Sequence, residues 1–370
     1  MNIRFPITNV FRSAYTDLRK RPAGNMPSLD VLRSAAILLV ISAHVGGFFS
    51  ARIQALPFVF YGWSGVDLFF VLSGLLIGGQ LWKELSKRGA IDIRRFVLRR
   101  GFRIWPLYYS FILVLGGLAL FKGESVRGFL VDICCVSNYY HHRVAGGWSL
   151  STEEQFYVLA PVLLYLGSRV IAPQALVALP AAWLLLLPVL RWRIVRNVPL
   201  SRIPEMRYYF PFHTHSDGLA AGLILAWIGV MRPSWMTINR GKALGITVIG
   251  IGLAFVLRHL SQGVFRFSSL AALFGSVTYF LLTFRPLPRV LQWQGFYVMS
   301  RLSYGMYLNH FHLLDFTAAL ALRAGKGSIG FILCWVVSVM ASMLASFATF
   351  AIVELPFLRM RERRLGHARR

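Results

Sequence analysis

The stretch LDVLRSAAILLVISAH, from Leu29 to His44, is apolar enough to begin a membrane-spanning helix. It nevertheless contains Asp30, Arg33 and His44, and ionisable side chains are costly inside a bilayer. Either this stretch does not span a membrane, or these side chains are there for chemistry. The remainder of the chain decides between the two.

The composition favours a membrane protein. Of the 370 residues, 56% are hydrophobic and 15% are charged, whereas soluble domains have about 45–50% apolar and about 25% charged residues. The net charge is +26, from 40 Lys and Arg against 14 Asp and Glu. A basic chain can indicate nucleic-acid binding, but the long apolar runs argue against it here, because positive charge also marks the cytoplasmic loops of membrane proteins.

We predict an all-α, polytopic integral membrane bundle of about ten helices, since a spanning helix needs about 20 mostly apolar residues. The predicted spans are 29–50, 62–81, 102–121, 148–168, 170–190, 212–231, 241–259, 267–284, 298–322 and 328–353. The bundle thus occupies residues 29–356, between a basic N-terminal segment (1–28) and a basic tail (357–370).

The orientation follows from the distribution of positive charge. An even number of spans puts both termini on one side, and the loops on that side carry about twice as many Lys and Arg as the opposite loops, which predicts cytoplasmic termini. One predicted outer loop does not fit this distribution, so either that loop binds an anionic acceptor or a span nearby is miscounted. The arginines of this loop are Arg191, Arg193, Arg196, Arg202 and Arg207.

Arg33 and His44 are eleven positions apart, which in a helix is three turns plus about 20°. They therefore share one face, roughly 16 Å apart along the axis, and Asp30 lies within pairing distance of Arg33 in sequence. Histidine is the side chain best placed to take a proton near neutral pH. The alternative is a structural helix whose arginine reaches the interface and whose histidine bonds to a backbone carbonyl.

Two further stretches carry charge at predicted membrane boundaries. Asp67, in GVDLFFVLSG, lies near the outer end of the second span and faces the level of His44 if the hairpin is tight. Arg99, Arg100 and Arg103, in RRFVLRRGFRIWPLYY, share one helix surface at the cytoplasmic boundary. That triad is either a positive-inside anchor or a site for a phosphate-rich ligand, because arginine binds phosphate oxygens in a fork geometry.

The segment GGWSLSTEEQFYVLAP, from Gly146 to Pro161, begins the fourth predicted span. Ser149 and Ser151 can cap this helix, and Glu153 at its start is then explained locally. A carbohydrate-binding surface is the other interpretation, because aromatic and polar side chains accompany the acidic residue. These side chains are Trp148, Gln155 and Tyr157.

Taken together, these segments resemble the membrane-bound acyltransferase-3 family. In the family's order, the matching motifs are LDVLRSAAILLVISAH, GVDLFFVLSGLLI, RRGFRIWPLYY, WSLSTEEQFY, SYGMYLNH and VELPF. The resemblance implies a bundle of about ten helices that transfers an acyl group, usually acetyl, from cytoplasmic acyl-CoA to a sugar hydroxyl. It implies no metal and no permanently bound cofactor. The chain ends soon after the last predicted helix, so we expect the O-acetyltransferase type without a fused extracytoplasmic hydrolase-like domain.

The resemblance also implies roles for particular residues. His44 is the implied catalytic base with Arg33 as its paired residue, and Asp67 or Glu153 orients the base or the sugar. Arg33 and the arginine triad are the implied binding residues for the donor's phosphates. The expected acceptor-binding residues are Trp148, Ser151, Gln155, Tyr157 and Tyr304. Direct transfer and an acyl-histidine intermediate both stay open.

The chain departs from the family at one motif. Many members have Arg-x-Asp before the sixth span, where this chain has His215-Ser-Asp217. The change weakens any role for position 215 that depends on charge. A His-x-His metal site with His213 is also disfavoured, because side chains at i and i+2 of a helix point apart.

The expected partners are acyl-CoA, a carbohydrate or glycolipid acceptor and the lipid bilayer, with no nucleic acid. The expected location is the bacterial cytoplasmic (inner) membrane. A transporter or flippase for a polysaccharide or lipid-linked sugar also fits many helices with buried charge, but it gives no reason for the arginine triad. The acceptor itself is left open by the sequence.

Overall fold

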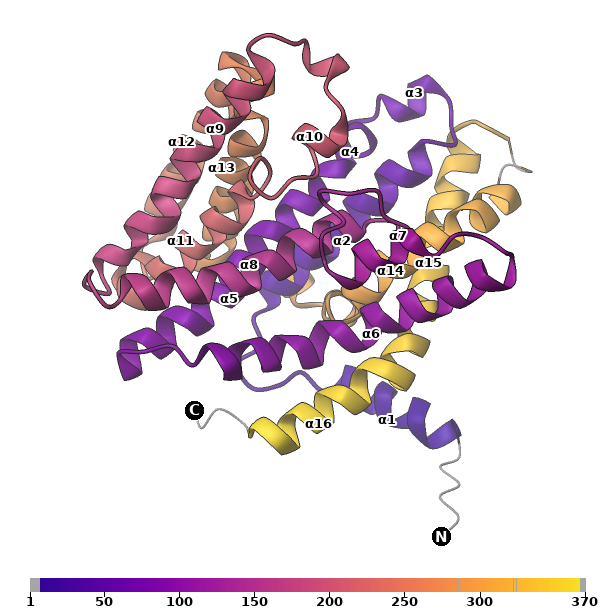
Figure 1. Cartoon of the computed structure of the whole chain (residues 1–370), viewed down its shortest axis with the longest axis horizontal. Helices are drawn as coiled ribbons and strands as arrows, with labels where there is room; N and C mark the ends of the chain where they lie inside the picture. Colours follow the sequence, from indigo (N-terminus) through magenta and orange to yellow (C-terminus); the bar gives the residue numbers. More distant parts are fainter. Residues whose placement is uncertain (1–6, 285, 322, 324, 367–370) are drawn as a thin grey trace. The chain divides into compact units, whose positions relative to one another are not determined.

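The computed structural model describes residues 7–284, 286–321, 323 and 325–366, and among them every regular element is helical. The prediction of an all-α membrane bundle is confirmed. Each predicted span coincides with a helix (Figure 1). These helices are α2 (Pro27–Gly46), α5 (Gly65–Arg88), α6 (Ile93–Phe121), α8 (Gly147–Gly167), α9 (Ala178–Val195), α11 (Asp217–Met231), α12 (Arg240–Leu260), α13 (Gln262–Thr283), α14 (Gln294–Ala321) and α15 (Ser328–Thr349).

Shorter helices connect these elements. They are α1 (Ile7–Arg19), α3 (Ala51–Gln54), α4 (Pro57–Phe60), α7 (Arg127–Ile133), α10 (Glu205–Tyr208) and α16 (Leu355–Leu365). Within the described residues, seven helices are long and apolar enough to cross a membrane by length and composition, and α11 is apolar but shorter. The motif-bearing helices α8 and α14 are not among the seven, so the count of about ten spans stays a prediction.

The chain divides into two compact units. The first comprises residues 1–65, 98–117 and 288–370, and the second comprises 66–97 and 118–287. Each unit has its own polar cluster, and the two are described separately.

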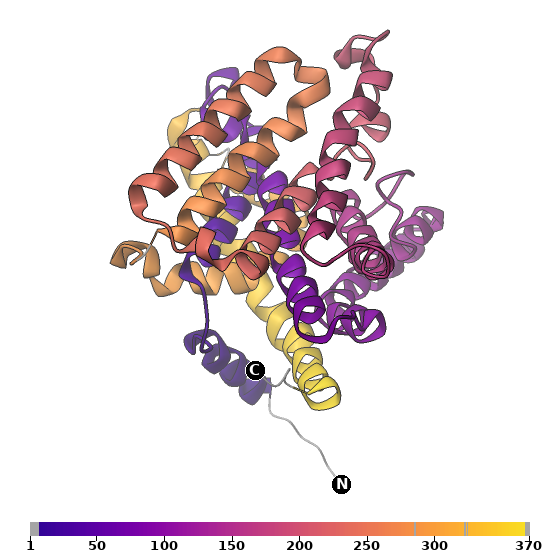
Figure 2. The same ribbon diagram turned by 90° about the vertical axis from the view of Figure 1, so that its left-hand side faces the viewer.

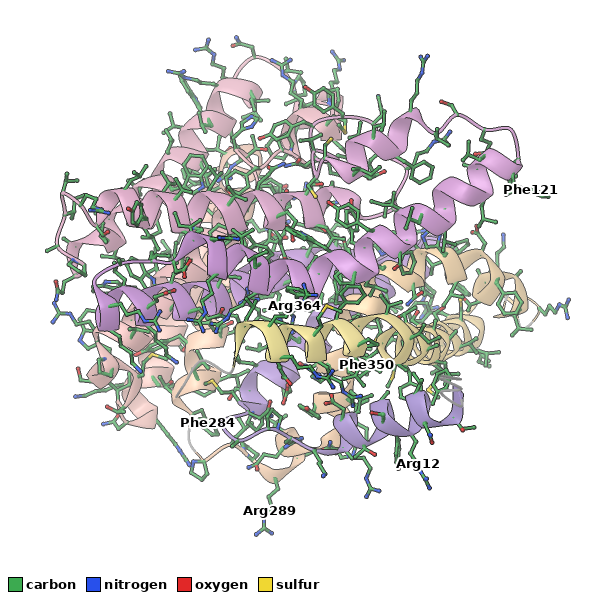
Figure 3. All side chains as sticks on the ribbon, turned by 60° about the horizontal axis from the view of Figure 1, so that its bottom comes forward. Arg12, Phe121, Phe284, Arg289, Phe350 and Arg364 are labelled. Carbon is green, nitrogen blue, oxygen red and sulfur yellow. The ribbon has the colours of Figure 1, made fainter. Side chains whose placement is uncertain are left out.

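In the first unit, α2 packs against α14 and α15. Ser34 donates a hydrogen bond to the Phe296 carbonyl (3.1 Å), and the Trp335 indole N–H donates to the Ser42 hydroxyl (2.8 Å). These contacts fix α2 near both of its ends. The basic helices α1 and α16 also belong to this unit, and Figure 3 labels Arg12 on the first and Arg364 on the second.

Between α15 and α16, the backbone of the first unit changes from α-helical to π-helical geometry. Residues Phe350–Glu354 form a π-helical turn, and Pro356 follows within the first turn of α16. A proline ring clashes with the carbonyl four residues earlier in an α-helix, and it has no N–H to donate. A wider π turn accommodates both effects, and such turns are frequent at functional sites.

In the second unit, glycines let α5 and α11 approach closely. A Cβ on Gly74 would lie 2.2 Å from the Leu219 carbonyl oxygen, and one on Gly222 would lie 2.1 Å from that of Val71. The Trp82 indole N–H donates to the Leu223 carbonyl (3.0 Å) along the same contact. Helices α12 and α13, in the same unit, form an antiparallel hairpin (Figure 2).

The start of α8 differs from the prediction that serines cap it. The N-cap is Gly146 with φ 74°, and no side chain caps the helix. Ser149 and Ser151 lie inside the helix, where the Ser149 hydroxyl donates back to the Gly146 carbonyl. The left-handed backbone that glycine allows makes the turn instead.

Candidate active site

His44 lies on α2 with its two ring nitrogens in different surroundings. Nδ1 is 2.8 Å from the Val40 carbonyl oxygen, which can only accept, so Nδ1 carries the proton. The Nε2 atom then holds a lone pair, and no hydrogen-bond partner for it is found among the described residues. The sequence alternative of a histidine satisfied by a carbonyl is therefore true of one nitrogen only. The other is available as a base.

His310 on α14 is the neighbour of His44 that sequence reasoning missed. It is fully buried, and its Nδ1 donates to the Tyr307 carbonyl at 2.7 Å, which leaves Nε2 as an acceptor. This Nε2 lies 3.4 Å from the Nδ1 of His44, and the Phe311 ring is edge-on to His44 at 4.5 Å between centroids. A protonated His44 can therefore share its Nδ1 proton with His310. His310 lies in the motif SYGMYLNH, but a partner 266 positions away cannot be read from one sequence.

An arginine cluster gathers at the other end of α2 in the first unit. The charges of Arg33, Arg100 and Arg301 act repulsively on Arg103, and Glu354 attracts it. The predicted residues Arg33, Arg100 and Arg103 are thus brought together. The cluster thus contains four guanidinium groups and one carboxylate, that of Glu354 in the π turn, which leaves an excess of positive charge.

Two members of the arginine cluster were not predicted. Arg301 on α14 also pairs with Asp17 of α1 (3.0 Å) and lies over the Phe350 ring. Glu354 is buried, and its Oε1 has no hydrogen-bond partner in the described part of the chain. Arg99 lies on α6 one position before Arg100.

The second unit contains an aromatic cage around His215. The imidazole stacks on Phe267 (centroids 3.6 Å apart) and on Trp148 (5.4 Å), with Tyr209 edge-on at 4.9 Å. Its Nε2 is 2.9 Å from Asp67 Oδ1, and its Nδ1 is 2.6 Å from the Tyr209 carbonyl oxygen. The prediction for Asp67 did not include this partner.

A second buried ion pair includes Asp217, two positions after His215 in the sequence. Arg191 is fully buried and binds both carboxylate oxygens of Asp217, at 2.7 and 3.0 Å. The remaining guanidinium N–H groups are directed to the carbonyls of Thr214 and Val264 and to the Ser268 hydroxyl. Arg191 was assigned to an outer loop, and that assignment is wrong, because α9 continues to Val195. Its charge is used inside the unit.

Besides Trp148, which stacks on His215, three of the predicted acceptor-binding residues make contacts within the second unit. Ser151 accepts a hydrogen bond from the Ser137 amide (3.2 Å), and Gln155 exchanges two hydrogen bonds with Asn138 (2.8 and 2.9 Å). The Tyr157 hydroxyl donates to the Glu153 carboxylate one turn earlier. In the first unit, the Tyr304 hydroxyl donates to the Ile104 carbonyl (3.1 Å). Their role in acceptor binding stays a prediction.

His213 and His215 do not share a ligand position. The Nδ1 of His213 contacts the Tyr139 hydroxyl at 3.0 Å, with the two rings stacked, whereas His215 contacts Asp67. Burial lowers the pKa of His213 and raises that of Tyr139. The two histidines therefore belong to separate contacts.

These helices and clusters define an integral membrane protein with a candidate base near one end of α2 and a cationic cluster, built from several helices, near the other. A family model described as an acyltransferase domain matches residues 26–351. The chain therefore belongs to this acyltransferase family.

Among curated proteins, the peptidoglycan O-acetyltransferase OatA of Listeria monocytogenes is 27% identical over 375 residues, covering 90% of this chain and 54% of that protein. The O-acetyltransferase OatA of Staphylococcus aureus is 23% identical over 359 residues, covering 90% of this chain and 57% of that protein. The chain thus spans about half the length of these relatives. No solved structure matches the chain significantly.

Proposed function

We propose that this chain is an integral membrane O-acyltransferase. It moves an acyl group, in the simplest case acetyl, from cytoplasmic acyl-CoA to a hydroxyl of a carbohydrate or glycolipid at the extracytoplasmic face. The observation that carries the proposal is that the two ends of α2 hold different chemical groups. Arg33 at one end joins the arginine cluster, and His44 at the other presents an open Nε2. The O-acetyltransferase names of the relatives agree with this proposal.

The arginine cluster is the proposed site for the phosphates of the donor. Phosphate oxygens accept forked hydrogen bonds from arginine, and the mutual repulsion of Arg33, Arg100, Arg103 and Arg301 is relieved when an anion lies among them. Glu354 offsets part of this charge. The donor's arm then extends along α2 toward His44, over roughly 16 Å.

The proposed chemical step is direct transfer with His44 as the base. Nε2 takes the proton of the acceptor hydroxyl as its oxygen attacks the thioester carbonyl carbon. The C–O bond forms, the C–S bond breaks, and the proton passes from His44 to the departing thiolate to give CoA thiol. During the step, the Nδ1 proton of His44 is shared between the Val40 carbonyl and His310. These two acceptors stabilise the transient imidazolium.

The proposed orientation puts the arginine cluster and both basic terminal helices on the cytoplasmic side of the inner membrane. The donor is made in the cytoplasm, so the phosphate site must open there. Helix α16 carries Arg359, Arg361, Arg363 and Arg364, as positive-inside segments do.

Mass spectrometry of cell-surface glycans tests the proposal. Cells that produce the chain should show sugars heavier by one acyl unit, which identifies both the group and the acceptor. His44→Ala should reduce this modification by roughly 100- to 10,000-fold, the usual contribution of a positioned base. The amount of protein in the membrane should stay the same.

His312→Ala is the matched control. His312 lies on α14 two positions after His310, and it is exposed and stacked on Phe111. This variant should modify glycans as the parent does. Normal modification by His44→Ala would refute the mechanism, and glycan transport without any acyl gain would instead identify a flippase.

A further inference from the structure

The His215 cage poses a question about protons. Both ring nitrogens of His215 lie within hydrogen-bond distance of oxygens: the Tyr209 carbonyl at Nδ1 and the Asp67 carboxylate at Nε2. A carbonyl cannot donate, so Nδ1 carries a proton. We propose that Nε2 is protonated as well, so that His215 is a buried imidazolium that holds Asp67 ionised and positions it for the acceptor.

The other arrangement puts the second proton on Asp67 and leaves both groups neutral. In water, imidazole holds a proton about 400 times more tightly than a carboxylate does, so the neutral pair forms only where burial reverses that order. Burial penalises separated charges, but these two are 2.9 Å apart and nearly inaccessible to solvent. Their attraction is strongest under those conditions.

The surroundings of the ring also favour a cation. Phe267 and Trp148 present their faces to His215, with interplanar angles of 21° and 22°, and aromatic faces attract cations. The neighbouring charges largely cancel, because Arg191 is matched by Asp217. Arg266, which lies over the Tyr209 ring, is the charge that opposes an imidazolium. The Tyr208 hydroxyl donates to the Gly263 carbonyl and is neutral, since burial raises its pKa to about 12.

Asp67 has a second oxygen with a different status. Oδ2 is buried and has no hydrogen-bond partner among the described residues, while Oδ1 faces His215. A buried carboxylate oxygen without a donor is costly, and a hydroxyl of the incoming sugar would supply the missing donor. His215 therefore acts through Asp67 as a positioning residue. This catalytic consequence rests on the proposed function, whereas the protonation state does not.

The proposed charge at position 215 is the one that an arginine would carry there. An imidazolium supplies the same single charge, but unlike a guanidinium it can be lost as the pH rises. The wild-type enzyme should then lose activity on the alkaline side. His215→Arg should not, because its charge is permanent.

Nitrogen NMR of ¹⁵N-histidine-labelled protein in detergent tests the protonation state without any substrate. At about pH 7.5 free imidazole has lost most of its proton, so imidazole added to the same sample provides the reference. Both ring nitrogens of His215 should still show the imidazolium shift. The signal is assigned by its absence from His215→Arg and from His215→Gln, so one well-folded variant is sufficient.

Asp67→Asn is the decisive variant, because it keeps the shape of the side chain and removes the charge. His215 should then become neutral at about pH 7.5, with one nitrogen unprotonated. An unprotonated Nε2 in the wild-type protein at that pH would overturn the proposal. So would an imidazolium that persists in Asp67→Asn.

Acyl transfer provides the second readout, with radiolabelled acetyl-CoA and the glycan fraction of the same membranes. His215→Arg should keep at least about a tenth of the neutral-pH rate and lose the alkaline decline, since it retains the charged hydrogen bond. His215→Gln should lower the rate at every pH. An alkaline decline that His215→Arg retains would overturn the positioning role. If the parent transfers no acyl group, only the proposed function fails, and the NMR result still decides the charge of His215.

Discussion

Three histidines of this chain share one feature and differ in another. In His44, His310 and His215, the Nδ1 atom faces a backbone carbonyl, from Val40, Tyr307 and Tyr209 respectively. They differ at Nε2, which is open in His44, faces another imidazole in His310 and faces a carboxylate in His215.

The difference separates their chemistry. A carbonyl at Nδ1 fixes the tautomer and places the lone pair at Nε2. Where nothing occupies Nε2, the ring can accept a proton from a substrate. Where a carboxylate occupies it, the ring is a cation and cannot act as a base. One residue type thus provides the proposed base of the first unit and the proposed imidazolium of the second.

The largest effect should be on stability, and it should distinguish His215 from His44. Replacing His215 by Gln leaves the buried Asp67 without its cation, which costs about 3–5 kcal/mol when one partner of a buried pair is removed. Replacing His44 by Gln removes one hydrogen bond, worth about 1 kcal/mol. Thermal unfolding of both variants in the same detergent, followed by near-UV circular dichroism, measures the contrast. Equal shifts in melting temperature for the two variants would mean that the carboxylate at Nε2 does not make His215 more important for stability than His44.

A smaller effect should follow from removing the partner of the base. His310→Ala takes away the acceptor that shares the Nδ1 proton of His44, and a hydrogen bond to a charged group is worth about 1.5–3 kcal/mol. The turnover number should fall by roughly 10- to 150-fold with little change in KM for acetyl-CoA. His312→Ala, on the same helix, should be unchanged in both constants. A rise in KM alone would assign His310 to donor binding instead.

The sequence was sufficient for α2, because helical periodicity and membrane cost are local properties. The joining of Arg33 with Arg100 and Arg103 followed from the family resemblance, not from a local pattern. The sequence failed where the partner is distant in the chain. His310 meets His44 only when α14 packs on α2, and Arg301 and Glu354 meet Arg103 of α6 only in the folded first unit. In a single sequence, no local pattern predicts such contacts between residues that are distant in the chain.

Position 215 is a different case. The substitution of His for Arg was taken to weaken a charge-based role, since a free histidine is mostly neutral at pH 7. The structure places oxygens at both of its nitrogens and aromatic faces on both sides of the ring. Only the surroundings reveal that a histidine there can hold a charge, and these come from four separate segments of the chain.

The smallest predicted effect concerns donor binding, and it distinguishes donor binding from proton transfer at His44. Arg100→Ala removes one of several cations of the arginine cluster, and the remaining guanidinium groups still hold the phosphates. KM for acetyl-CoA should rise by about tenfold, the value of one partly exposed charged hydrogen bond, while the turnover number stays the same. The rise should shrink at high salt, since screening weakens the parent's advantage. Arg94→Ala, an exposed arginine on the same helix, is the matched control and should leave KM unchanged. A fall in turnover number with unchanged KM would place Arg100 with His44 in the chemical step, and the arginine cluster would then have to be reassigned.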